Sequence, residues 1–155
     1  SLRHCRTVSV AGNSFTKAIG QSLNLSFEEA EQIKKEKGVV KVDSDSNPLP
    51  PTAMRIFNVI DPVLNELVTE VQRSFDYYRS RYRESIELVI LSGGTARFKN
   101  LDAYLATKLG VHCEVANPFR RVAITRAQEA SSEQLEDLAP MAAVVMGLAL
   151  YEVKT

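Results

Sequence analysis

The chain has 155 residues, of which 45% are hydrophobic and 25% charged, the composition of a folded domain with one core or two small ones. Its 19 basic and 19 acidic residues balance, so the total charge does not favour a nucleic acid or an anionic membrane surface as a partner. The hydrophobic content argues against a disordered chain.

The spacing of the cysteines and the length of the apolar runs further limit which class of protein this chain can belong to. Cys5 and Cys113 each follow a histidine, but neither pair has the spacing of a zinc motif, and two such cysteines are typical of a reducing compartment. The longest apolar run, residues 141–150, is about half of what a bilayer requires. With no signal peptide visible, we expect a soluble protein.

The first predicted unit is a strand followed by a helix. Residues 6–10 alternate and favour β structure, and apolar residues at helical spacing begin at Phe15. Gly12 therefore lies where the carboxyl end of a strand meets the amino end of a helix. Backbone N–H groups at such a position can approach a phosphate, so we expect a phosphate or ribose turn at Gly12.

A second helix is predicted to begin at Ser26, because Ser26 and Glu29 have the spacing of a capping box, and to end at Gly38. Residues 39–42 resemble a short strand. The polar, proline-rich stretch 43–51 breaks every regular period and is predicted to be an exposed loop.

A long amphipathic helix follows the loop. Asp61 and Pro62 indicate that this helix restarts after a bend. The arginines between residues 73 and 83 alternate with the apolar stripe and with acidic residues, which favours a solvated face. The stripe itself advances in steps of four and three and consists of Ile60, Leu64, Leu67, Val71, Phe75, Tyr78 and Tyr82.

The most informative stretch is residues 87–96. Apolar, β-favouring residues end abruptly at Ser92-Gly93-Gly94-Thr95, and a helix is predicted from Asn100 to Leu109. Paired glycines at the carboxyl end of a buried strand let backbone N–H groups approach a ligand, and nucleotides are the usual ligand of such a turn. A simple tight turn gives the same pattern, so this motif alone does not decide between the two.

The remaining elements complete an α/β pattern. Residues 111–116 are predicted to form a strand with Cys113 inward and His112 outward. Residues 131–138 are polar and loosely helical, and residues 140–150 are apolar nearly all round, which predicts a helix buried on most sides. Three strand-to-helix units favour helices on the faces of a sheet.

Several motifs, taken in order, resemble the second half of the actin-like ATPases. They are the turn at residues 11–16, the helix ending at 33–36, the turn at 91–96 and the final Ala/Gly-rich helix. Within that superfamily, residues 59–78 and 115–119 resemble the type IV pilus assembly protein family PilM, and the cell-division family FtsA is the nearest alternative. The resemblance covers Arg6 to Leu150.

This resemblance implies a fold class and a division of the chain. The expected fold is α/β, the second domain of an actin-like (ribonuclease H-like) ATPase, partial, with a mixed sheet and flanking helices. Residues 1–25 and 86–155 would form a core nucleotide-facing subdomain (2A-like). Residues 26–85 would form an inserted helical subdomain (2B-like) that carries the exposed loop 43–51.

The resemblance also implies an ATP site, with Mg²⁺ in the full-length protein. Lys34 would face the ribose and adenine, although a solvated helix lysine is the alternative. Phe98 would stack over the base, although a core aromatic is the alternative. The implied cofactor-binding residues are Gly12, Lys34, Gly93, Gly94, Thr95 and Phe98, and Ala96 could line the same pocket; no catalytic or metal-binding residue is assigned.

Actin-like ATPases need a phosphate-binding hairpin from each of two domains and acidic groups that hold Mg²⁺. No such hairpin with a catalytic carboxylate precedes Arg6, so we expect a fragment that lacks the first domain. Because phosphoryl transfer depends on groups on both sides of the nucleotide, we expect this chain to be inactive by itself and to bind nucleotide weakly or not at all.

The family implies the partners as well. PilM-like proteins are scaffolds at the cytoplasmic face of the inner membrane, where they bind the cytoplasmic tail of PilN, mainly through the first domain, and other pilus assembly proteins. The alternative is an FtsA-like cell-division protein or another actin-like module that self-associates. An unrelated small enzyme is the third possibility, but no poised nucleophile, base or metal cluster supports it.

Overall fold

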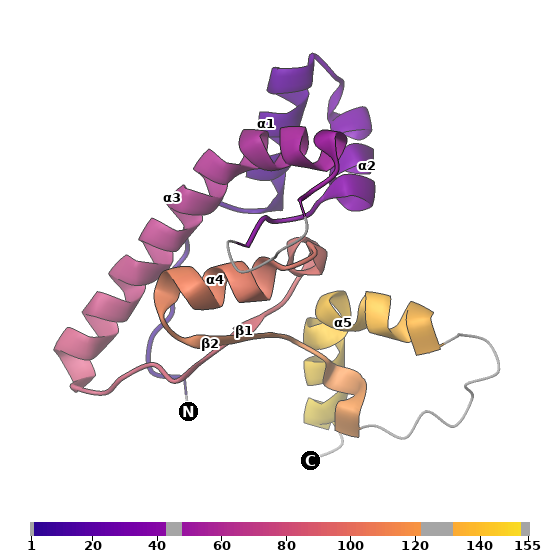
Figure 1. Ribbon diagram of the computed structural model, residues 1–155. Helices are drawn as coiled ribbons and strands as arrows, with labels where there is room; N and C mark the ends of the chain where they lie inside the picture. Colours follow the sequence, from indigo (N-terminus) through magenta and orange to yellow (C-terminus); the bar gives the residue numbers. More distant parts are fainter. Residues whose placement is uncertain (1, 43–47, 122–131, 153–155) are drawn as a thin grey trace.

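The computed structural model describes residues 2–42, 48–121 and 132–152. Figure 1 shows a long helix, α3, along one side, with α1, α2 and α4 packed against it and α5 on the far side of the small sheet. The elements in chain order are α1 (Gly12–Leu23), α2 (Phe27–Lys37), α3 (Pro51–Tyr82), β1 (Leu88–Leu91), the 3-10 helix η1 (Gly94–Arg97), α4 (Leu101–Leu109), β2 (His112–Val115), the 3-10 helix η2 (Pro118–Arg121) and α5 (Ser132–Glu152).

The described residues form one parallel sheet of two strands, β1 and β2, joined by α4. Leu88 lies opposite His112 and Leu91 lies opposite Val115. As predicted, His112 is exposed and Cys113 is buried. Burial, together with the nearby charge of Asp102, raises the pKa of the Cys113 thiol, as expected for a structural rather than a reactive cysteine.

The strands predicted at residues 6–10 and 39–42 are wrong. Val39 makes only an isolated bridge with Lys99, and residues 6–10 form no ladder with any described residue. A strand needs a neighbour to pair its N–H and C=O groups, and a β-favouring sequence does not supply one. Of the loop predicted at 43–51, residues 43–47 lie outside the described residues, and Pro51 is the first residue of α3.

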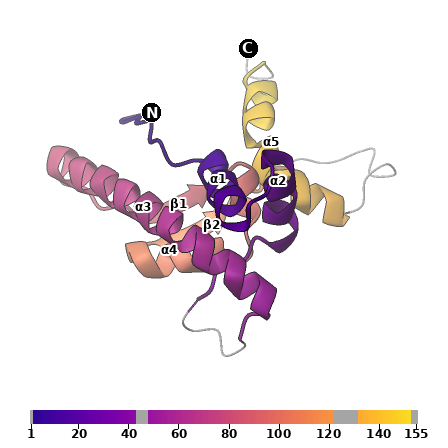
Figure 2. The same ribbon diagram turned by 90° about the horizontal axis from the view of Figure 1, so that it is seen from above.

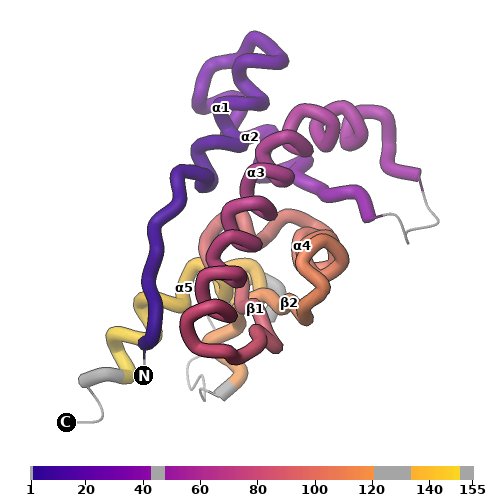
Figure 3. The backbone as a smooth tube through the Cα atoms, turned by 90° about the vertical axis from the view of Figure 1, so that its left-hand side faces the viewer, coloured from indigo at the N-terminus to yellow at the C-terminus, as the bar shows by residue number. Residues whose placement is uncertain are grey.

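Side chains hold the segment before α1 in place. Figure 3 shows this segment as an extended trace that leads into α1. Arg3 forms an ion pair with Glu84 at 2.6 Å, and the Tyr82 hydroxyl donates to the Arg3 carbonyl oxygen at 2.8 Å. Arg6 pairs with Glu70 of α3. The segment is therefore fixed against the carboxyl-terminal half of α3 without a strand partner.

The predicted capping box at the start of α2 is confirmed. The Glu29 N–H donates to the Ser26 hydroxyl at 3.2 Å, and the Ser26 N–H donates to the Glu29 carboxylate at 2.9 Å. Hydrogen bonds to the Glu29 carboxylate from the Ser26 backbone N–H and from the Ser26 side chain lower the pKa of Glu29. The helix ends at Gly38, as predicted.

The helix α3 runs through Pro62 without interruption, so the predicted restart at Asp61 is wrong. Proline removes one helix hydrogen bond, but the neighbouring turn is reinforced because the Asn65 side chain donates to the Asp61 carbonyl oxygen at 3.0 Å. On both sides of Pro62 the apolar stripe is buried, at Ile60 and Leu64. Packing of this stripe outweighs the local cost of the proline.

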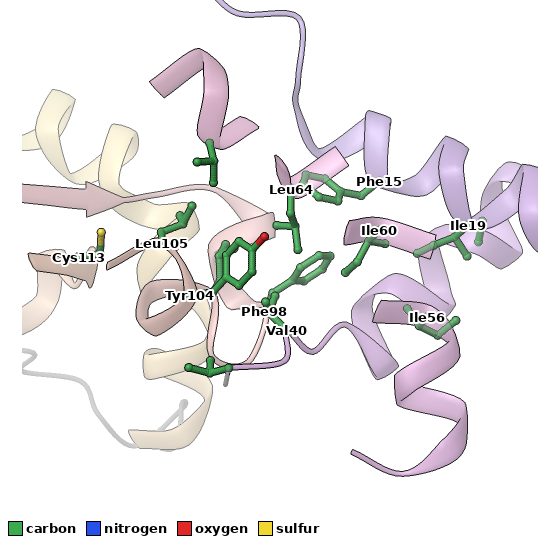
Figure 4. Packing of buried hydrophobic residues seen from close by; sticks show 14 residues of the cluster. Phe15, Ile19, Val40, Ile56, Ile60, Leu64, Phe98, Tyr104, Leu105 and Cys113 are labelled. Atoms are coloured by element: carbon green, nitrogen blue, oxygen red, sulfur yellow. The ribbon is translucent and has the colours of Figure 1, made fainter. Parts of the chain in front are cut away.

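The core lies where α1, α3 and α4 meet, and Figure 4 shows how its side chains converge. Phe15 and Ile19 enter from α1, Ile60 and Leu64 from α3, and Tyr104 from α4. The cluster thus contains residues from both of the subdomains expected from the sequence. The division into 2A-like and 2B-like parts stays a prediction.

The last predicted helix exists as α5, but its predicted burial is wrong. Val144 is 71% exposed, Val145 66% and Leu148 67%. Within the described residues, α5 packs against η1 and η2, which cover only part of it. Figure 2 shows that α5 is bent, consistent with Pro140 inside it. None of the described helices, α5 included, is long and apolar enough to cross a membrane.

Candidate functional site

A cavity with a volume of about 910 Å³ lies between α1, α2, β1 and the turn after β1. Its lining includes the apolar residues Val8, Val10 and Ile90 and the charged residues Glu31 and Lys35. All six residues predicted to bind a cofactor line this cavity: Gly12, Lys34, Gly93, Gly94, Thr95 and Phe98.

Gly12 is the point at which three segments converge. A Cβ atom added to Gly12 would lie 3.0 Å from Thr95 Oγ1 and 3.8 Å from Lys34 Nζ. Glycine therefore lets the amino end of α1 approach η1 and α2 closely. Ala11, which precedes the helix, makes no side-chain capping hydrogen bond to it. The first turn of α1 borders the cavity with backbone N–H groups that no N-cap side chain satisfies.

The Gly93–Gly94 turn forms the facing part of the cavity wall. Gly93 has a φ of +93°, which side chains other than glycine rarely adopt, and its N–H donates to the Pro140 carbonyl oxygen at 2.8 Å. A Cβ atom added to Gly93 or Gly94 would meet no atom within 4 Å. The turn is thus anchored to α5 on one side and faces open space on the other.

Lys34 is buried, with 7% of its surface exposed, so its interpretation as a solvated helix lysine is wrong. Its ammonium lies 2.8 Å from Thr16 Oγ1, 3.3 Å from the Gly12 carbonyl oxygen and 2.5 Å from Glu31 Oε2. A buried ammonium needs such partners, because removing it from water costs several kcal/mol. Lys34 thereby joins α2 to the first turn of α1.

Glu31, Thr16 and Lys35 also belong to this site, although no sequence motif predicted them. The Glu31 carboxylate accepts a hydrogen bond from the Thr16 hydroxyl at 2.5 Å, and its second oxygen lies 3.8 Å from Lys35 Nζ. Burial would raise the pKa of Glu31, but hydrogen bonds from Lys34 and Thr16 and the charges of Lys34 and Lys35 lower it. The signal in the sequence was the i, i+3 spacing of Glu31 and Lys34 on one face of α2.

Phe98 is packed into the core and borders the cavity at the same time. Only 6% of its surface is exposed, and its ring meets Phe15 edge-to-face at a centroid distance of 5.6 Å. A Cβ atom added to Gly38 would lie 2.6 Å from the Phe98 ring. This burial supports the core-aromatic interpretation, and stacking on a base stays a prediction.

The cavity is lined by more positive than negative charge. Its described lining residues include one carboxylate, Glu31, and four cations, Arg6, Lys34, Lys35 and Arg97. Arg6 and Arg97 are paired with residues outside the lining, Glu70 and Asp137. Among the described residues, no group of three or more His, Cys, Asp or Glu side chains could hold a metal ion. The site is suited to an anionic ligand rather than to a bare cation.

The comparisons with known proteins decide the family. A family model described as type IV pilus assembly protein PilM matches residues 2–153. The chain belongs to the PilM family. A solved structure titled "PilM-PilN type IV pilus biogenesis complex" is similar over 94% of this chain, with a TM-score of 0.77 and 35% sequence identity. The resemblance to PilM, rather than to FtsA, is thus confirmed.

The same comparison confirms the fold class, a partial PilM-type actin-like fold that is rich in helices around a small parallel sheet. This chain covers 38% of the matched chain, so it spans about two fifths of the length of that PilM structure. The site described above therefore corresponds to one portion of a larger protein of the family.

Proposed function

We propose that this PilM-family chain forms one wall of an ATP pocket in a scaffold protein for type IV pilus assembly. The observation that carries this proposal is the convergence of two glycine turns, at Gly12 and at Gly93–Gly94, on one cavity with a surplus of cationic side chains. Both turns let backbone N–H groups approach a ligand closely, and cationic side chains attract phosphates.

Each part of the cavity suits a different part of the nucleotide. The first turn of α1 and the Gly93–Gly94 turn, which both line the cavity, would face the phosphates. The α2 residues Glu31, Lys34 and Lys35 lie on the side where the ribose and base would rest. The apolar residues of the lining, among them Val8, Val10 and Ile90, suit contact with a flat aromatic ring.

The residues present do not fit a Mg²⁺ site or a hydrolytic centre. Glu31 is the one carboxylate among the described lining residues, and it is already engaged by Lys34 and Thr16. Phosphoryl transfer requires carboxylates that hold the metal and orient the attacking water. We therefore expect no ATP hydrolysis by this chain alone, and the groups that would hold Mg²⁺ are to be sought outside the described residues.

The proposal includes a partner. The matched structure is that of a PilM–PilN complex. By analogy, the full protein binds the cytoplasmic tail of a PilN-like inner-membrane protein and other pilus assembly proteins, and it is a cytoplasmic protein held at the inner membrane through that partner. The PilN-like tail would dock mainly on the first domain, outside this chain. A PilN-tail peptide that binds this chain as tightly as the full-length protein would contradict that assignment.

Nucleotide binding is tested by substitution at Gly94. In Gly94→Val the added side chain meets no protein atom near its Cβ, so the fold should persist while the space for phosphates is filled. Calorimetric titration with ATP should show affinity reduced by about tenfold or more, an energy of about 1.4 kcal/mol. Gly147→Val, in α5 and outside the cavity lining, is the matched control.

Two results would contradict the proposal. One is equal ATP affinity in the Gly94→Val variant and the parent chain. The other is steady ATP turnover by the purified chain, because a single wall of the pocket is not expected to support phosphoryl transfer. Circular dichroism before each titration separates loss of the site from loss of the fold.

A further inference from the structure

We infer that two copies of this chain associate through the free edge of β1, which pairs in antiparallel orientation with β1 of a second copy. The exposed apolar face of α5 continues the same interface. This association does not depend on the proposed nucleotide site, because every contact that it requires is between protein atoms.

The strand β1 has an edge without a ladder. Among the described residues its one strand neighbour is β2, and the Ala116 N–H donates to the Leu91 carbonyl oxygen at 2.8 Å. In a parallel pair, alternate residues of a strand direct both their N–H and C=O groups to opposite sides. Leu91 and Val89 therefore bond to β2, whereas Leu88 and Ile90 direct their backbone groups to the free edge.

The sequence of this edge does not protect it from pairing. Natural edge strands are commonly blocked by charged side chains, by proline or by a bulge. The strand Leu88–Leu91 has only aliphatic residues that suit a strand, and its register with β2 is continuous. Leu88 is 44% exposed and Ile90 59%. The edge therefore combines unpaired backbone groups with exposed apolar side chains.

The exposed face of α5 lies beside the end of β1. The Gly93 N–H, two residues after β1, donates to the Pro140 carbonyl oxygen of α5 at 2.8 Å, and Met141 lines the same cavity as Ile90. Further along α5, the exposed apolar side chains include Val144, Val145 and Leu148. Apolar surface thus continues from the strand onto the helix.

The absence of charge makes a second copy the partner that this surface fits. A two-fold interface places residues near their own counterparts, so that a charge close to the axis meets the same charge. Residues 88–96 and 140–150 contain no Asp, Glu, Lys or Arg. With Val89 on the axis, Leu88 lies opposite Ile90 of the second copy, and the two exchange backbone hydrogen bonds. Glu87 then lies opposite Leu91 rather than opposite another carboxylate.

The first experiment follows backbone hydrogen exchange in the ligand-free chain at increasing protein concentration, with the mass measured by light scattering. As the mass rises from monomer to dimer, exchange at Leu88 and Ile90 should slow, because pairing removes their N–H groups from water. Val89 and Leu91 bond to β2 and should be protected at every concentration. A dimer with unchanged exchange at Leu88 and Ile90 would show association through α5 alone and overturn the inference.

The second experiment removes one donor from the edge. Ile90→Pro deletes an N–H that β2 does not use, and proline is tolerated on edge strands. The dissociation constant of the dimer should rise by about tenfold or more. Ile90→Val, which keeps the N–H and an apolar, β-branched side chain, is the matched control and should associate like the parent chain. Unchanged association of folded Ile90→Pro would show that the edge does not pair.

A second variant covers the case in which circular dichroism shows that Ile90→Pro does not fold. Leu88→Pro changes the first residue of β1, where proline is also accepted, and unchanged association there contradicts the inference. Two further results would do the same. One is slow exchange at Leu88 and Ile90 in the monomer, which would mean that a segment of the same chain covers the edge. The other is a monomer at every concentration.

Discussion

Gly38 and Gly147 show how differently single glycines are constrained in this fold. A Cβ atom at Gly38 would lie 2.4 Å from the Lys34 carbonyl oxygen and 2.6 Å from the Phe98 ring, whereas one at Gly147 meets nothing within 4 Å. The first position is closed by backbone and core, and the second is open. Their substitutions should therefore have opposite effects on stability.

We expect Gly38→Ala to lower the free energy of unfolding by about 1–3 kcal/mol, the usual cost of overpacking a core. The Lys34 carbonyl belongs to α2 and cannot move aside without disturbing that helix. Urea unfolding measures the effect, with Gly147→Ala as control, for which a small gain from helix propensity is expected. A Gly38→Ala midpoint equal to that of the parent chain would show that the Phe98 packing is looser than described.

The lowered pKa of Glu31 predicts how the contribution of this side chain to the stability of the fold depends on pH. A carboxyl whose pKa is lower in the folded state stabilises the fold above its ordinary pKa of 4.5, and this stabilisation disappears as pH falls through the folded-state pKa. Glu31→Gln should therefore destabilise the chain at about pH 7 and progressively less as the pH falls below about 4.5. Urea unfolding at several pH values tests this, with exposed Glu66→Gln as control. If the difference in unfolding free energy between Glu31→Gln and the parent chain did not change with pH, the ionised hydrogen-bonded state of Glu31 would be contradicted.

At the scale of elements, the cap of α2 matters because α2 carries the charged wall of the cavity. Ser26→Ala removes the acceptor for the Glu29 N–H and should cost about 1 kcal/mol. Ser22→Ala, at an exposed position inside α1, is the matched control and should not destabilise, since alanine favours a helix interior. Hydrogen exchange of the first turn of α2 should increase in Ser26→Ala only, and equal exchange in both variants would be evidence against the cap.

Elements with local signals could be predicted from the sequence. The capping box at Ser26, the helix ends at Gly38 and Gly110, and the strand before Gly93 all follow from residues within a few positions of one another. The errors concern features that depend on distant partners. Residues 6–10 lack a described neighbour for a ladder, and Pro62 is tolerated because the stripe of α3 is buried against other elements.

The candidate site could be predicted in part for the same reason. The glycine turns and Lys34 were found because they belong to short motifs that resemble a known superfamily. Thr16 and Glu31 were missed because their importance depends on how α1 packs against α2, which brings the Thr16 hydroxyl to the Glu31 carboxylate. Helical periodicity identifies a face but not the group that will lie opposite it.

At the scale of the whole molecule, the main unexplained surface is the outer face of α5. Val144, Val145 and Leu148 are each exposed by about two thirds or more, and no charged residue lies between Pro140 and Leu150. Exposed apolar surface of this kind is uncommon on a stable monomer, because each buried Å² contributes about 25 cal/mol. The chain by itself should therefore associate through this face.

We expect the apparent mass of the purified chain, measured by light scattering, to rise with concentration. Val145→Lys combined with Leu148→Lys should keep it monomeric, because charges on this face oppose its burial. Leu2→Lys, at a residue 85% exposed in the amino-terminal segment, is the control and should leave association unchanged. An apparent mass that rises only when ATP is present would instead favour a self-associating module driven by nucleotide. A monomer at every concentration would show that the α5 face does not drive association in water.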